Sequence, residues 1–201
     1  MSEKQKKPIY KRKWFIALAA LLVLGAIGSF FEEEPTEAPE PAETAQAEEQ
    51  PTQDFNMESY KADVADVFTK HAQDFDLIRG NTQNTINSLS QDGDIYAAYE
   101  GVKNSSRAME SLRQRVSDME APDYLTKDQK ELFGQVKTAL YNASGYSRSA
   151  YDDLAKDLDK GDLSPSRIEN QKEWTSMVDQ EIIKYAASLA ALNADVGYVA
   201  E

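Results

Sequence analysis

Residues 94–120 carry a heptad repeat of apolar residues, which constrains the fold more than any other part of the chain. Two rows recur every seven residues: Ile95, Val102, Met109 and Val116 in one, and Ala98, Ser105, Leu112 and Met119 in the other. This spacing places both rows on one stripe of a helix, as in the seam of a bundle or coiled coil. No stretch from Phe55 onward alternates as a strand would, so we predict an all-α domain over residues 54–201.

Three further segments show helical spacing. The first begins near Asp54, and poor helix formers at Gly80-Asn81-Thr82 predict a kink or break before its end near Ser90. The next begins at a capping box, Thr126 to Gln129, and ends at Gly161. The last opens with Ser164-Pro165, a cap followed by proline at the first helical position. Their predicted seams are Val64, Phe68, His71, Phe75 and Ile78; Phe133, Val136, Leu140, Ala143, Ser147, Ala150 and Leu154; and Ile168, Thr175, Val178, Ile182, Tyr185, Leu189, Leu192 and Val196.

Short joints separate these helices, at 91–93, 121–125 and 161–163. Short joints between long helices make neighbours antiparallel, so we predict an up-down-up-down four-helix bundle. A three-helix bundle with a loose first segment is the alternative.

Residues 14–31 read WFIALAALLVLGAIGSFF, a run of 18 residues without a charge. This length suits a membrane-spanning helix. Residues 1–13 carry six basic residues, and acidic residues follow the run, which predicts a cytoplasmic N-terminus and an extracytoplasmic C-terminal domain. Cleavage near Gly28, which would release a secreted protein, is the alternative. The leader KKPIYKRKWF resembles the start of signal-anchored surface proteins of Gram-positive bacteria, a resemblance of composition that implies location only.

Residues 32–53 form a linker rich in proline and glutamate, with no large apolar residue. We predict a disordered spacer, since such a segment cannot bury enough surface to offset its ordering entropy. The bundle is acidic too: residues 55–201 hold 16 basic and 25 acidic residues, a net charge of −9. This charge disfavours nucleic acid as a partner. The absence of cysteine excludes disulfides and thiolate metal sites.

His71 is the only histidine and falls on the seam of the first helix, which favours a core role. Asp92-Gly93-Asp94 resembles a fragment of a calcium loop, but the closing position of such a loop is Lys103, so a turn with a helix cap is the better interpretation. We therefore predict no cofactor, no metal site and no catalytic residues, and hence a protein that is not an enzyme.

Aromatic residues flank small seam residues on the last two predicted helices: Tyr141, Tyr146, Tyr151 and Trp174. Tyrosine and tryptophan in such places line protein interfaces or close the edges of a bundle. We predict a membrane-anchored, non-enzymatic protein that binds another envelope or surface macromolecule, a protein partner, through Tyr146, Tyr151 and Trp174. The alternative is a ligand-sensing ectodomain that works through a membrane partner.

Overall fold

The computed structural model describes residues 55–162 and 164–199, and every element in those ranges is helical. The elements are α2 (Met57–Tyr60), the π-helical turn η2 (Lys61–Ala65), α3 (Asp66–Asp92), α4 (Ile95–Ser117), α5 (Lys127–Lys160) and α6 (Pro165–Asp195). The predicted all-α class is confirmed. The predicted cytoplasmic tail, membrane segment and linker lie outside the described residues. Within the described ranges, no helix has the length and apolar character needed to span a bilayer.

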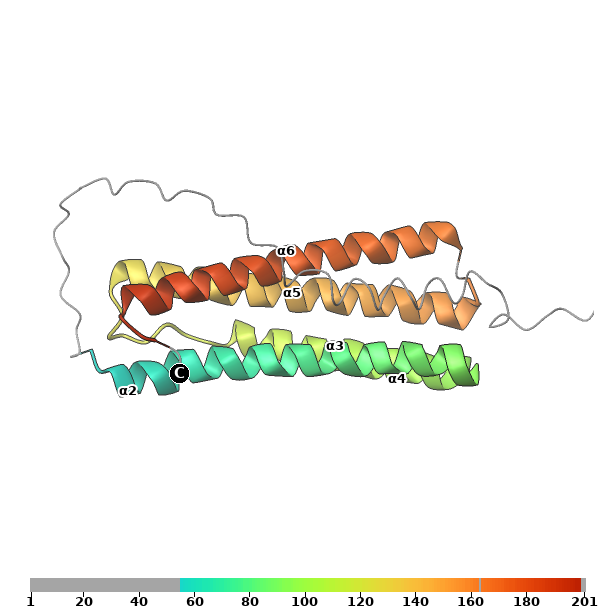
Figure 1. Ribbon diagram of the computed structural model, residues 1–201, viewed down its shortest axis with the longest axis horizontal. Helices are drawn as coiled ribbons and strands as arrows, with labels where there is room; N and C mark the ends of the chain where they lie inside the picture. The colour runs from blue at the N-terminus through green and yellow to red at the C-terminus, as the bar shows by residue number, and fades with distance from the viewer. Residues whose placement is uncertain (1–54, 163, 200–201) are drawn as a thin grey trace, which may run out of the picture.

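The four long helices lie side by side (Figure 1), and each packs against the next one along the chain. α5 makes the most extensive packing, with α4 and with α6. The start of α2 and the end of α6 lie at the same end of the domain (Figure 1). The first segment is helical and packs on α4, so the alternative with a loose first segment is wrong.

Several helix ends follow the predicted sequence signals. Thr126 and Gln129 form the reciprocal capping box of α5, and Gly161 ends α5 with φ of 63°. Asp94 caps α4, with its Oδ1 accepting a 2.9 Å hydrogen bond from the Ala97 backbone N–H. Gly93 precedes it with φ of 71°, a left-handed conformation that glycine adopts without strain. The turn-and-cap interpretation of this segment is therefore confirmed.

The predicted break at Gly80-Asn81-Thr82 is wrong, because α3 continues unbroken to Asp92. The hydroxyl groups of Thr82, Thr85 and Ser88 bond back to the carbonyls four residues earlier, so these poor helix formers satisfy their polar groups inside the helix. This half of α3 also has its own core. The buried members of that cluster are Ile86, Leu89, Ala98, Val102, Leu154, Ala155 and Leu158. Tertiary packing thus outweighs weak local propensity.

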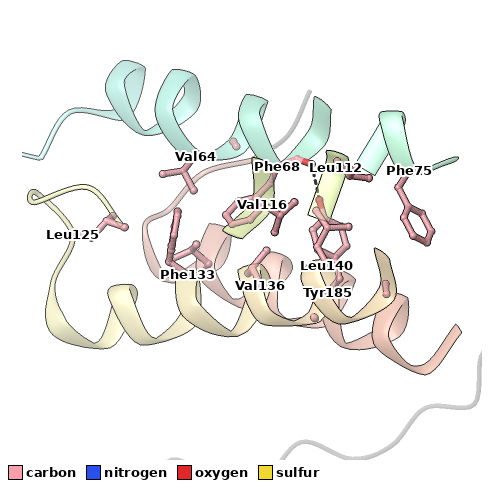
Figure 2. Close-up of a cluster of buried hydrophobic side chains, with 14 of the residues drawn as sticks. Val64, Phe68, Phe75, Leu112, Val116, Leu125, Phe133, Val136, Leu140 and Tyr185 are labelled. Carbon is pink, nitrogen blue, oxygen red and sulfur yellow. Dashed lines mark hydrogen bonds between the residues drawn. The ribbon is translucent and has the colours of Figure 1, made fainter. Parts of the chain in front are cut away.

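The larger core holds the other half of the bundle together (Figure 2). Its side chains come from all four long helices and from the preceding turn, and they include Val64, Phe68, Phe75, Leu112, Val116, Phe133, Val136, Leu140 and Tyr185. The Tyr185 hydroxyl donates a 3.0 Å hydrogen bond to the Phe68 carbonyl, which joins α6 to α3 (Figure 2). On α6 the predicted seam is only partly buried, since Val178, Tyr185 and Leu192 are buried whereas the other five members are half-buried.

Candidate partner-binding face on helices α5 and α6

Tyr146 of α5 and Trp174 of α6 come together at the junction of the two helices. Their ring centroids lie 6.2 Å apart with the ring planes inclined at 37°, and both residues are half-buried. The indole N–H of Trp174 donates a 3.3 Å hydrogen bond to Oδ2 of Asp153 on α5. The hydrogen bond and the neighbouring ring restrict the indole, so it needs little further ordering to serve as an anchor for a partner.

A polar group lies next to the pair along the same two helices. The carboxylate of Glu181, a buried residue, accepts a 3.2 Å hydrogen bond from the Asn142 amide and a 2.6 Å bond from the Lys184 ammonium. The hydrogen bond and the negative charge of Glu181 raise the pKa of Lys184. The lysine side chain itself remains largely exposed. Glu181 stands seven residues, about two turns, after Trp174 on the same side of α6.

Met177 completes the surface. It is 39% exposed and stands three residues after Trp174 and four before Glu181, a spacing that puts the three side chains on one side of α6. We call this surface the α5–α6 face; it consists of Asn142, Tyr146 and Asp153 from α5 and of Trp174, Met177, Glu181 and Lys184 from α6. It holds two half-buried aromatic rings and a thioether beside the Asp153–Lys156 and Glu181–Lys184 ion pairs.

Tyr151 does not join this face. Its ring packs against both core clusters, and its hydroxyl has Thr82 of α3 as a hydrogen-bond partner with Arg79 nearby. Burial raises the pKa of this phenol. The structure therefore brings together two of the three predicted binding residues and places the third between the helices, where it links the two cores.

Tyr141 of α5 lies against α4. The Arg113 guanidinium of α4 donates to the Tyr141 hydroxyl, and it also holds the Glu110 carboxylate with two hydrogen bonds of 2.9 Å. Those bonds lower the pKa of Glu110. Arg148 of α5 lies 3.3 Å from the same carboxylate. The Tyr141 ring thus belongs to a polar network that joins α4 to α5.

The adjacent pair Asp152-Asp153 divides between the two sides of α5. Asp152 Oδ1 accepts a 2.6 Å hydrogen bond from the Ser106 hydroxyl of α4, whereas Asp153 bonds Trp174 of α6. Both side chains remain partly exposed, and each also lies near a basic residue of α5, Arg148 for Asp152 and Lys156 for Asp153. Successive residues on a helix point about 100° apart, so adjacent acids can serve different neighbours.

His71 lies in the core as predicted, and only 9% of the residue is exposed. Its Nδ1 atom is buried and has no hydrogen-bond partner. Across the ranges 55–162 and 164–199, no group of three or more His, Cys, Asp or Glu side chains is arranged to hold a metal ion.

Sequence reasoning missed five members of the α5–α6 face: Asn142, Asp153, Met177, Glu181 and Lys184. The available signal was the spacing of Trp174, Met177 and Glu181, which lie at three- and four-residue intervals on α6. The chain matches no family model, no curated protein and no solved structure.

Proposed function

We propose that this chain is a membrane-anchored, non-enzymatic protein whose bundle lies outside the cytoplasm and binds a partner protein through the α5–α6 face. The apolar run at 14–31 and the charge asymmetry around it support the anchor and its orientation. The short joints between long helices support an up-down-up-down order of the four helices. The linker at 32–53 would separate the bundle from the bilayer.

The observation that carries the binding proposal is the Tyr146–Trp174 pair with the exposed Met177 beside it. Tyrosine, tryptophan and methionine are enriched in the cores of protein interfaces, and polar side chains form the rim. Asp153 and Lys184, whose side chains are partly exposed, supply such a rim here. Trp174 is already fixed by its contacts, and a partner side chain would therefore meet an ordered ring.

The charge of the domain indicates the character of the partner. Residues 55–201 carry a net charge of −9, whereas on the α5–α6 face Lys156 and Lys184 pair with the carboxylates of Asp153 and Glu181. A partner with basic residues would therefore be attracted by the overall charge of the domain. The same charge opposes association with nucleic acid.

Site-specific crosslinking tests the proposal. A photoreactive amino acid at Met177 in the full chain should trap one envelope protein, and Trp174→Ala in the same chain should abolish that product. The matched control is Tyr96→Ala, because Tyr96 is a 74% exposed tyrosine on α4, away from the face. If the product persists in folded Trp174→Ala, or disappears in Tyr96→Ala, the α5–α6 face is not the binding site.

A further inference from the structure

His71 is the single histidine of the chain, and the bundle encloses its ring. Along α3 it stands three residues after Phe68 and four before Phe75, both fully buried and labelled in Figure 2. Nδ1 is buried without a partner. A neutral imidazole tolerates this place when Nε2 carries the hydrogen, because Nδ1 then has only a lone pair and needs no acceptor.

Three charged groups lie near His71. Arg115 from α4 and Lys70 from α3 oppose a second proton on the ring, whereas Asp74 from α3 favours it. Arg115 Nη2 already donates a 2.7 Å hydrogen bond to Asp74 Oδ2, an ion pair that ties α4 to α3. Burial, and then the positive charge of Arg115, lower the pKa of His71. The nearby carboxylate therefore compensates only in part for the two cations and the apolar surroundings.

We propose that His71 is an acid-sensitive switch whose protonation loosens α3 from α4 in the layer between Phe68 and Phe75. The added proton creates an N–H at Nδ1, a buried atom that has no acceptor, near the positive charge of Arg115. The ring can relieve this state by turning toward water or toward Asp74. Either movement disturbs the layer, and the second competes with the Arg115–Asp74 pair.

The sign of the pH effect follows from the lowered pKa. The folded state binds this proton less readily than the unfolded state, in which the pKa is about 6.5. The contribution of the neutral ring to stability is therefore complete above that value and is lost as the pH falls through it. The loss therefore begins below about pH 6.5 and continues as the pH falls to the lower folded-state pKa of His71.

The wild-type full chain in neutral detergent gives the first test. One histidine gives one set of imidazole signals, so its NMR titration needs no assignment by mutation. We expect a midpoint below 6.5 and, at pH 5, faster amide hydrogen exchange in α3 and α4 near His71 than in α5 after correction for the intrinsic rates. A midpoint at or above 6.5, or unchanged exchange in α3 and α4, would overturn the switch.

Thermal melts between pH 7.5 and 5 give the second test. The wild type should lose Tm relative to His71→Gln as the pH falls, since the variant lacks the titrating ring. The matched control is His71→Gln combined with Gln73→His, which moves the imidazole to an exposed position on the same helix; its profile should parallel that of His71→Gln. Parallel profiles for the wild type and His71→Gln would refute the proposal. If His71→Gln does not fold, the titration and exchange of the wild type decide alone. The switch concerns α3 and α4, so its failure leaves the proposed function untouched.

Discussion

Replacing Trp174 by alanine separates a binding role from a structural one. In the structure the change removes one ring of the Tyr146–Trp174 pair and the hydrogen bond to Asp153. An aromatic pair contributes about 0.5–1.5 kcal/mol beyond its buried area, and a hydrogen bond to a charged group about 1.5–3 kcal/mol. Because the indole is only half-buried, water can replace part of the ring contact and part of the hydrogen bond in the variant. We therefore expect Trp174→Ala to lose about 1–3 kcal/mol of stability.

Binding should suffer more than folding. Truncation of an aromatic anchor at the centre of an interface costs at least about 2 kcal/mol of binding free energy, which corresponds to a weakening of about 30-fold. Trp174→Phe keeps a ring beside Tyr146 but loses the N–H donor, so it should retain most of the affinity. Tyr96→Ala, at an exposed position on α4, should change neither quantity.

The assay measures both quantities on the same proteins. Denaturant unfolding gives the change in stability, and titration against the partner identified by crosslinking gives the change in affinity. An affinity within twofold of the wild type in folded Trp174→Ala would refute the binding role. A stability loss equal to that of Leu140→Ala, a truncation in the fully buried core, would assign Trp174 to the core instead.

Three further changes test the fold and its placement. Gly101→Ala should destabilise the bundle by about 1–3 kcal/mol, because the new Cβ would lie 2.6 Å from Thr85 Cγ2. In a Thr85→Ala background the same change should instead stabilise the bundle by about 1 kcal/mol, because alanine has a higher helix propensity than glycine. Denaturant unfolding measures both effects. Burial raises the pKa of Asp157 although Arg167 lies 3.3 Å away, so this group favours folding at low pH and loses that advantage as the pH rises through its folded-state pKa. Asp157→Asn should therefore be at least as stable as the wild type at pH 7 and relatively less stable near pH 3. If the variant is less stable than the wild type at pH 7 only, the Arg167–Asp157 ion pair outweighs the cost of burial. Protease added to intact wall-free cells should cut residues 32–53 and release the bundle, and protection of the bundle until lysis would contradict its extracytoplasmic location.

The parts of the fold that were predictable are those set by short-range chemistry. The heptad rows of α4, the capping box at Thr126 and the glycine at 161 each have a local physical cause, and the structure contains all three. The continuity of α3 through Thr82 was not predictable in the same way. It depends on a second core formed with residues from α4 and α5, which no window of the sequence around Gly80 contains.

The candidate site shows the same division. Tyr146 and Tyr151 both flank small seam residues of α5, and five residues of helix turn them about 140° apart. Tyr146 therefore packs against Trp174 on α6, whereas the hydroxyl of Tyr151 lies near Thr82 on α3. Spacing predicts that both residues lie beside the seam, but the partner of each depends on which helix occupies which side of α5. The arrangement of the helices around α5 is set by tertiary packing, which residue spacing within α5 does not encode.

The choice of the α5–α6 face over other exposed apolar residues depends on clustering. Leu77 and Tyr96 are exposed too, but they stand on α3 and α4. Ile183 is exposed on α6, nine residues after Trp174, which is about two and a half turns and places it on the opposite side of that helix. Single exposed apolar side chains are a normal feature of protein surfaces. Trp174 instead has a ring from a second helix against it, an exposed methionine one turn away and a carboxylate on its indole N–H. Binding hot spots of protein interfaces commonly combine a fixed aromatic anchor with surrounding polar residues, and this combination supports the α5–α6 face as the proposed binding site.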